Sequence, residues 1–232
     1  MVYQPPTLTA LTPAETRPGA VVQLTSTHFS PVAALDSVWF NGVAARVLQA
    51  TATSLQVDVP VGAGTGRVHL STLGGMVERT QSFRIWYPPL ITGFSPAKAA
   101  ANAVVTVTGS ALAEDGSRNS VFFGAARATV LQASSGRVQV RVPRDAESGP
   151  VRLETPGGAA SAAGFIFLPA PVITAYQPTQ GSVGTPVTLT GRHFQVDGQT
   201  DTIWLAGVPA RLVSASPTEL RVLVPRGTRT GA

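Results

Sequence analysis

The sequence has no cysteine, and charged and aromatic residues make up only 12% and 6% of its 232 positions. Without cysteine, disulfide scaffolds, cysteine nucleophiles, thiolate metal sites and covalent haem attachment are excluded together. The apolar runs stay far below the ~20 residues that a bilayer-spanning helix needs. We therefore expect no membrane insertion, and the first residues show neither the basic nor the apolar stretch of a signal peptide.

The chain is rich instead in turn-forming and apolar residues, with 23 glycines, 19 prolines and 44% hydrophobic positions. This composition favours many turns around a packed core and excludes wholesale disorder. The net charge of +5 could indicate a nucleic-acid partner. The bases are scattered, however, and Lys98 is the only lysine among the 17. We interpret the excess as an arginine-rich composition and do not expect nucleic-acid binding.

Prolines and glycines recur along the chain at intervals of 82 or 83 residues. Such regularity at several independent landmarks indicates an internal repeat. It predicts three tandem modules, at residues 1–87, 88–169 and 170–232. The recurring positions are Pro13, Pro96 and Pro178; Gly42, Gly124 and Gly207; Pro60, Pro143 and Pro225; and Gly66, Gly149 and Gly231.

Within each repeat, short segments alternate between apolar and polar residues, as in residues 21–25 and 55–60. Alternation with β-branched residues, bounded by glycine and proline, is typical of antiparallel strands. About seven such strands in ~82 residues predict a small two-sheet sandwich. The fold class is therefore all-β, because no segment has a sustained helical period.

The third module is predicted to be truncated, because only Ala232 follows Gly231 whereas 16 residues lead from Gly149 to Phe165. We expect it to lack its last strands, which would leave unpaired backbone and an uncovered core. Either the natural chain continues, which we favour, or a neighbouring chain donates a strand.

Two stretches of the third module, residues 181–194 and 203–211, resemble the IPT/TIG family of immunoglobulin-like modules of the early-set (E-set) type. The valine-proline pairs that end one strand of each repeat also resemble the family, and so do the paired glycines before the closing phenylalanine. The second module departs from it, with residues 97–102 where glycines are usual. The resemblance implies tandem immunoglobulin-like sandwiches. It leaves function open, since such modules occur in bacterial surface proteins, receptor ectodomains, polysaccharide-acting enzymes, phage structural proteins and transcription factors.

The joints between modules, residues 83–89 and 165–171, are short, apolar and rich in proline. This composition predicts semi-rigid connections rather than flexible tethers. We expect four side chains to pack between adjacent modules: Trp86, Tyr87, Phe167 and Leu168.

No pattern of catalytic residues is present, and the prediction is a protein that is not an enzyme and has no catalytic residues. His28 and His193 occupy the same place in two modules, which favours a role in closing a turn. Calcium is the one cofactor considered, because Asp115–Asn119 and Asp197–Asp201 share the pattern Asp-Gly-x-x-Asn/Asp. The first module keeps only Asp36 there, and such residues are also favoured in turns for geometric reasons.

Trp39, Phe122 and Trp204 recur at one strand position, between residues that alternation turns toward the core. Outward aromatic side chains that recur at one place suggest a shared lateral contact surface. The alternative is that a neighbouring loop or module covers each ring. The same rings could also stack on sugars, so a carbohydrate ligand stays open.

These observations predict a non-catalytic structural or adhesive rod of modules. It would contact other protein subunits, or further copies of itself, in a phage virion, an appendage or a bacterial surface assembly, which implies a virion or extracellular location. The start at Met1 favours the virion. One alternative is a carbohydrate-binding accessory region of a larger surface or polysaccharide-acting protein. The second is a Rel-like nucleic-acid-binding module, which predicts a steep dependence of binding on salt.

Overall fold

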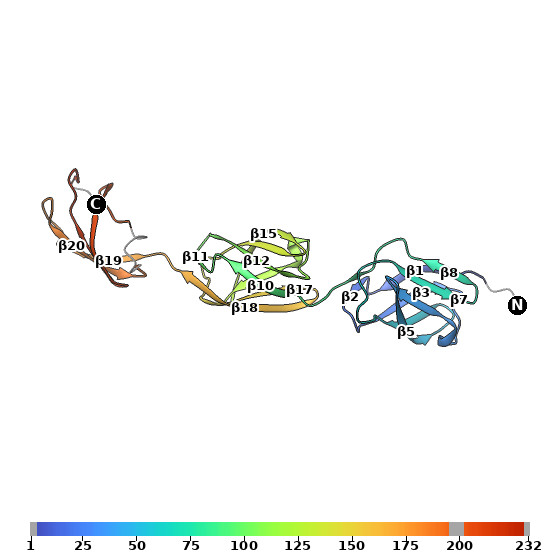
Figure 1. Cartoon of the computed structure of the whole chain (residues 1–232). Helices are drawn as coiled ribbons and strands as arrows, with labels where there is room; N and C mark the ends of the chain where they lie inside the picture. The colour runs from blue at the N-terminus through green and yellow to red at the C-terminus, as the bar shows by residue number, and fades with distance from the viewer. Residues whose placement is uncertain (1–3, 195–201, 230–232) are drawn as a thin grey trace. The chain divides into compact units, whose positions relative to one another are not determined.

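The computed structural model describes residues 4–194 and 202–229, which form β-strands joined by turns and two short 3₁₀ helices (Figure 1). No α-helix occurs in these residues, which confirms the all-β prediction. The chain divides into two compact units, residues 1–97 with 104–165, and residues 98–103 with 166–232. The strands group into three sandwiches, called first, second and third below, and the module boundaries stay predictions.

The first sandwich has two layers that share one strand. β5 pairs with β6 in one layer and with β4 in the other, so the seven main strands follow the order β1-β3-β6-β5-β4-β7-β8. The short β2 and β9 pair in parallel. The elements are β1 (Thr7–Thr12), β2 (Glu15–Thr16), β3 (Val21–Thr27), η1 (Ala33–Leu35), β4 (Ser37–Phe40), β5 (Val43–Ala50), β6 (Ser54–Asp58), β7 (Val68–Thr72), β8 (Gly75–Glu78) and β9 (Arg84–Ile85).

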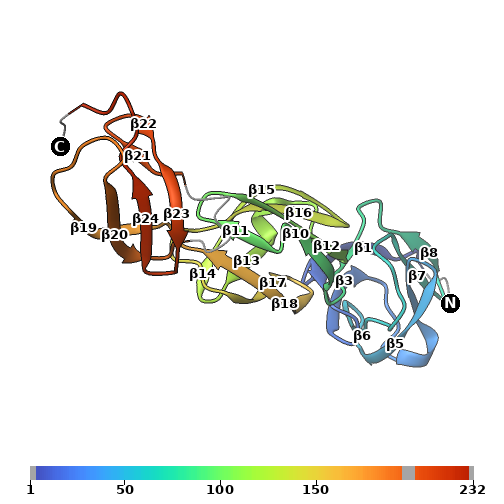
Figure 2. The ribbon, with the colours of Figure 1, turned by 60° about the vertical axis from the view of Figure 1, so that its left-hand side comes forward.

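The second sandwich keeps the two layers as separate sheets, with orders β10-β12-β16-β15 and β11-β18-β17-β13-β14 (Figure 2). The strand that corresponds to β5 is interrupted at Ala128 and becomes β14 and β15. The elements are β10 (Leu90–Ser95), β11 (Lys98–Ala100), β12 (Val104–Ser110), η2 (Gly116–Arg118), β13 (Ser120–Phe123), β14 (Ala126–Arg127), β15 (Thr129–Ser134), β16 (Arg137–Arg141), β17 (Gly149–Thr155) and β18 (Gly158–Leu168).

The third sandwich contains a sheet in the order β19-β20-β24-β23, which corresponds to the sheet β10-β12-β16-β15 of the second sandwich. Its other layer contains the pair β21 and β22 within the described part of the chain. The elements are β19 (Val172–Gln177), β20 (Pro186–Arg192), β21 (Trp204–Leu205), β22 (Val208–Pro209), β23 (Arg211–Ala215) and β24 (Glu219–Leu223).

Alternation along the strands builds each core. On β4, Val38 and Phe40 are buried, and on β13 the buried pair is Val121 and Phe123. The phenylalanine that closes each of these two repeats packs against the phenylalanine of this pair: the ring centres of Phe40 and Phe83 lie 5.2 Å apart, and those of Phe123 and Phe165 lie 4.4 Å apart. Edge-on and tilted aromatic pairs of this kind add to the stability gained by burial.

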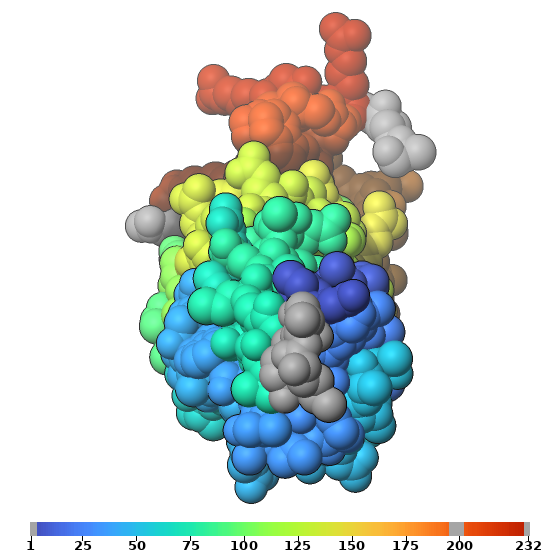
Figure 3. Space-filling model, turned by 90° about the vertical axis from the view of Figure 1, so that its right-hand side faces the viewer, coloured from blue at the N-terminus to red at the C-terminus, as the bar shows by residue number. Residues whose placement is uncertain are grey.

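The paired glycines before the closing phenylalanine have two separate physical reasons. A Cβ at Gly74 would lie 1.9 Å from the carbonyl oxygen of Gln4, and one at Gly157 equally close to that of Tyr87. The second glycine of each pair has φ of +133° or +146°, a backbone conformation that disfavours side chains. Figure 3 shows the β7–β8 hairpin, in turquoise, lying against the first described residues, in dark blue. The hairpin therefore packs directly on the segment that enters its own sandwich.

Asn102 explains how the second sandwich forms without the usual glycine. Its φ is +68°, and it occupies the place of Gly19 and Gly184, whose φ angles are +78° and +85°. Asparagine tolerates this left-handed conformation better than most residues. The three prolines that open the repeats also match, since each follows a cis peptide bond, at Thr12-Pro13, Ser95-Pro96 and Gln177-Pro178.

Candidate functional site

The three outer aromatics, Trp39, Phe122 and Trp204, lie on corresponding strands β4, β13 and β21. Trp39 and Phe122 are half-buried between fully buried neighbours, so their rings lie on the face away from the core. Trp204 is 61% exposed. The structure thus places all three where alternation puts them, while their role as a contact surface remains a prediction.

The neighbours of the outer aromatics differ between the first two sandwiches. Phe122 pairs across the strands with Arg152, whose guanidinium lies 4.7 Å from the ring centre and forms an ion pair with Glu154 at 2.8 Å. Trp39 has His69 at the same position, and the His69 Nε2 lies 3.5 Å from the Glu78 carboxylate. Phe122 is therefore covered by a cation, which is a stabilising arrangement for an aromatic face.

An open groove lies beside this strand in each of the first two sandwiches. Its volume is about 400 Å³ in the first and about 620 Å³ in the second. The 3₁₀ turn forms one wall and the strand after the aromatic hairpin forms the other. Six lining positions correspond: Ala33, Ala34, Asp36, Ala44, Ala45 and Val47 in the first, and Gly116, Ser117, Asn119, Arg127, Ala128 and Val130 in the second.

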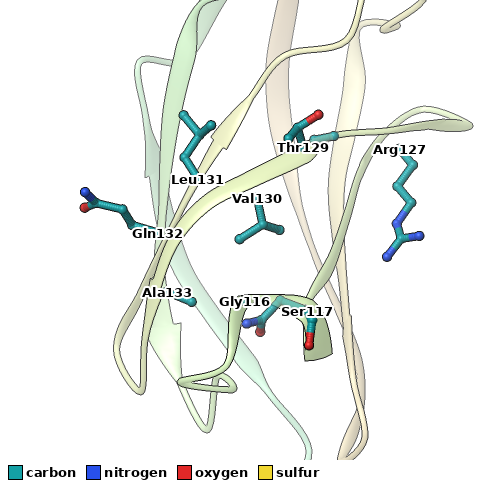
Figure 4. Close-up of a pocket in the computed structure, with 10 residues that line it drawn as sticks. Gly116, Ser117, Arg127, Thr129, Val130, Leu131, Gln132 and Ala133 are labelled. Carbon is teal, nitrogen blue, oxygen red and sulfur yellow. The ribbon is translucent and has the colours of Figure 1, made fainter.

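The two grooves have different chemistry. Figure 4 shows Val130 pointing into the space between its strand and the turn at Gly116 and Ser117, with Gln132 pointing away. Arg127 borders this groove and donates to the Ser120 hydroxyl at 3.0 Å. The first groove has Ala44 in the place of Arg127 and includes Trp39 in its lining. It is thus an apolar groove with one aromatic side, whereas the second is polar and cationic.

The loops that form the turn walls each hold one buried polar side chain. These are the Asp36 loop, residues 30–36, and the Asn119 loop, residues 113–119. Asp36 is 4% exposed and Asn119 is 1% exposed. Burial raises the pKa of Asp36 above its ordinary value, and the hydrogen bond from the Ser30 N–H opposes this rise. The alignment of the repeats could have singled out Asp36, because the copies place it opposite Asn119.

The calcium candidates serve the loop itself. The Asp115 carboxylate accepts bonds from the Ser117 N–H and hydroxyl, and these bonds lower its pKa. The Asn119 amide is bonded to the backbone of Ala113. Asp197 and Asp201 lie outside the described residues. Over residues 4–194 and 202–229, no three His, Asp or Glu side chains group as a metal site. A calcium site at these residues stays a prediction.

The histidines occupy turn positions, as the sequence indicates. His28 and His193 have left-handed φ angles of 64° and 62°. The Nδ1 atoms of these rings lie 3.2 Å from the Pro5 carbonyl and 3.3 Å from the Ala170 carbonyl, respectively. Each ring thus ties the end of one strand to the start of the same repeat.

The predicted joint residues have varied surroundings. Trp86 is 7% exposed and lies under two guanidinium groups, Arg84 at 4.7 Å and Arg118 at 5.4 Å from its ring centre. Arg118 also forms an ion pair with Glu15. The Tyr87 hydroxyl accepts from the Gly62 N–H and donates to the Ala63 carbonyl, both at 3.1 Å. Phe167 and Leu168 are half-buried and pair with β11. Packing of these four side chains between modules remains a prediction.

The model of the IPT/TIG domain matches residues 89–165 and 171–232, which together make up more than half of the chain. The chain belongs to the IPT/TIG family. The matched regions are the second and third sandwiches, and the first sandwich repeats their strand pairings. A search of curated proteins gives no match.

Several solved structures are similar to the chain at low identity. The extracellular region of plexin A4 is 16% identical with a TM-score of 0.41, covering 95% of this chain and 21% of that one. The surface glycan-binding protein PbSGBP-B from Prevotella bryantii is 14% identical, with a TM-score of 0.36, covering 71% and 43%. SGBP-B from Bacteroides uniformis is 17% identical, with a TM-score of 0.34, covering 81% and 62%. The chain spans less than two thirds of each, and these similarities carry no argument about its ligand.

The described part of the chain contains no helix long and apolar enough to cross a membrane.

Proposed function

We propose that the chain is a non-catalytic array of immunoglobulin-like modules that holds protein subunits together in a bacterial surface, appendage or phage-particle assembly. One observation carries this proposal: an aromatic side chain recurs outside the core at the same strand position in all three sandwiches. A repeated surface of this kind suits several simultaneous weak contacts, which reach high avidity together. Aromatic side chains on an outer face are typical anchors of such contacts.

The location of the chain in its own organism tests this proposal. Antibody labelling in electron micrographs should find it in an envelope, an appendage or a particle. The triple variant Trp39→Ala, Phe122→Ala, Trp204→Ala should be lost from that assembly. A matched control removes exposed apolar side chains elsewhere, at Val61 and Met76. A chain found only in the cytosol, or a triple variant retained as well as the control, would refute the proposal.

Carbohydrate binding is a second candidate, and the first groove favours it. Trp39 borders that groove together with Ser37 and four alanines, which leave space of about 400 Å³ beside the ring. Sugar rings present apolar faces that stack on aromatic side chains, while their hydroxyls bond to nearby polar groups. If the protein binds carbohydrate, its migration in affinity electrophoresis should be slowed by a polysaccharide in the gel.

The expected result for carbohydrate binding is retardation that Trp39→Ala reduces and Met76→Ala leaves unchanged. Trp204→Ala separates a single site from a repeated one, because it removes the aromatic of the third sandwich only. Unretarded migration through gels of a broad range of plant and bacterial polysaccharides would count against this candidate and leave the assembly proposal intact.

A further inference from the structure

The Asp36 loop and the Asn119 loop have the same backbone. Each is preceded by an N–H that bonds to a carbonyl in the neighbouring turn, from Phe29 to Ala52 and from Leu112 to Ser135. The residue before each 3₁₀ helix has similar dihedral angles, φ −102° and ψ 107° against −75° and 113°. The residues after the helices, Asp36 and Asn119, agree as well, at −113° and 138° against −105° and 131°.

Asn119 uses both ends of its amide to close the loop. Its Oδ1 accepts the Ala113 N–H at 3.1 Å. Its Nδ2 donates to the Ala113 carbonyl at 2.7 Å and to the Asp115 carbonyl at 3.3 Å. The buried polar atoms of the side chain are therefore satisfied, which a polar group inside a protein requires.

Asp36 reproduces only half of this arrangement. Its Oδ2 accepts the Ser30 N–H at 3.0 Å, as Asn119 Oδ1 does from Ala113. Its Oδ1 is buried and has no hydrogen-bond partner. The carbonyls of Ser30 and Val32 correspond to those of Ala113 and Asp115, which accept from Asn119 Nδ2. Because the loop dihedral angles are similar and Oδ2 takes the place of Asn119 Oδ1, we infer that Oδ1 faces these two carbonyls. An ionised carboxylate would place the acceptor Oδ1 against carbonyl oxygens, which are also acceptors. In a buried site such an arrangement costs free energy.

We propose that Asp36 is a proton-binding site: in the folded first sandwich it is a neutral carboxylic acid whose Oδ1–H donates to a loop carbonyl, and loss of that proton loosens the loop. The proton leaves to water as hydronium or to a buffer base, and no other bond changes. The protonated carboxyl has the shape of the primary amide of Asn119 and, like it, places a donor on one atom and an acceptor on the other, although it has one hydrogen fewer to donate.

The charged groups on the surrounding elements are engaged elsewhere. Arg46 of β5 forms an ion pair with Asp58 at 3.3 Å. His69 of β7 faces Glu78, and His28, which precedes the loop, contacts the Pro5 carbonyl. Burial, not a nearby charge, is the first cause of the raised pKa of Asp36. Burial favours the neutral acid, as the hydrogen-bond geometry also requires.

The sign of the pH effect follows from this. A carboxyl whose pKa is raised in the folded state stabilises the fold while it is protonated. That stabilisation is lost as the pH rises above the ordinary value of 3.8 and through the raised value. Because the Asp36 loop is a wall of the groove beside Trp39, the groove should loosen in the same range.

Carbon-13 NMR of the whole chain, labelled at the aspartate carboxyl carbons, tests the proposal directly. The Asp36 signal, assigned by its absence in Asp36→Asn, should stay at the carboxylic-acid position after exposed aspartates have become carboxylates. In parallel, hydrogen exchange should show protection of the Asp36 loop falling with pH in the parent, by up to about tenfold per pH unit. Asp36→Asn should remove that dependence.

Asn119→Asp is the reciprocal variant, and it should create the same pH dependence in the second sandwich. Titration with CaCl₂ provides a further test, because Oδ1 and the two carbonyls that it faces could also attract a cation. An Asp36 signal that titrates with exposed aspartates, or that moves with Ca²⁺ at constant pH, would overturn the proposal. If Asp36→Asn does not fold, the pH dependence of hydrogen exchange in the Asp36 loop of the parent and in the second sandwich of Asn119→Asp still decides between the outcomes.

Discussion

The first and second sandwiches share a framework and differ at adjoining positions on one face. Trp39, His69 and Asp36 of the first correspond to Phe122, Arg152 and Asn119 of the second. In the second, each polar or aromatic group has a partner inside the module. In the first, the ring borders a groove, and one of the two carboxyl oxygens of Asp36 has no hydrogen-bond partner. The comparison teaches that a repeat can keep its core and its backbone while its outer face acquires different chemistry.

The shared core should dominate stability, so the largest expected effect is the same in both sandwiches. Phe40→Ala and Phe123→Ala each remove a fully buried ring that packs on the closing phenylalanine. We expect each to cost about 3–5 kcal/mol of unfolding free energy in its own sandwich. Hydrogen exchange of the whole chain, followed by mass spectrometry, measures the two sandwiches separately. Costs that differ by more than twofold would break the comparison.

The paired glycines come next. Gly74→Ala and Gly157→Ala each place a methyl group 1.9 Å from a backbone carbonyl, so the hairpin must shift. Strain of this kind costs on the order of 2 kcal/mol. Gly136→Ala is the matched control, because its nearest neighbour would lie at 3.7 Å. Chemical denaturation of each variant measures the cost, and equal losses for all three would contradict the explanation.

The partners of the outer aromatics sharpen the comparison further. Arg152→Ala removes both the cation over Phe122 and the ion pair with Glu154. At this exposed site we expect a loss of about 0.5–1 kcal/mol. His69→Ala in the first sandwich should cost less, since the ring makes a longer contact with Glu78. Denaturation at low and high salt checks this, because the ion-pair part of the Arg152 effect should shrink with salt.

The smallest effect is expected at Glu15. The hydrogen bond from Arg118 holds the pKa of Glu15 below its ordinary value of 4.5. A lowered pKa stabilises the fold above that value, and the contribution is lost as the pH falls through the lowered one. The parent should therefore be slightly more stable than Glu15→Gln at neutral pH, and the difference should vanish on acidification. This pH dependence of stability is opposite in direction to the one expected for Asp36. A stabilising contribution of Glu15 that grew on acidification would refute the explanation that Arg118 lowers its pKa.

Much of the framework could be predicted from the sequence, because alternation and repeat spacing report directly on which side chains are buried. Val38 and Phe40, for example, are buried on either side of Trp39. The alignment of Gly42 with Gly124 was a less reliable guide, because the two glycines do not occupy corresponding positions in the hairpins of the two sandwiches. In the structure Gly124 has the turn position of Asn41, since Phe40 pairs with Val43 and Phe123 with Ala126. Asn41 and Gly124, two residue types that tolerate positive φ, thus occupy the same position, with φ of 47° and 67°.

The chemistry of the face was harder to predict, because it depends on contacts between segments that spacing does not specify. Asp36 resembled a calcium ligand or a turn residue, and only its burial shows that one oxygen lacks a partner. The cover over Phe122 depends on Arg152, a strand away in space and 30 positions away in sequence. Prediction therefore found the aromatics but not their partners.

Tyr87 has a consequence for anyone who divides the chain into pieces. Its hydroxyl is anchored to Gly62 and Ala63 in the first sandwich, while its carbonyl receives the close approach of Gly157 in the second. One residue thus contributes to two sandwiches, and a gene fragment that ends or starts at Tyr87 removes its contacts from one of them. Expression of the second sandwich by itself calls for an overlapping fragment that duplicates this tyrosine.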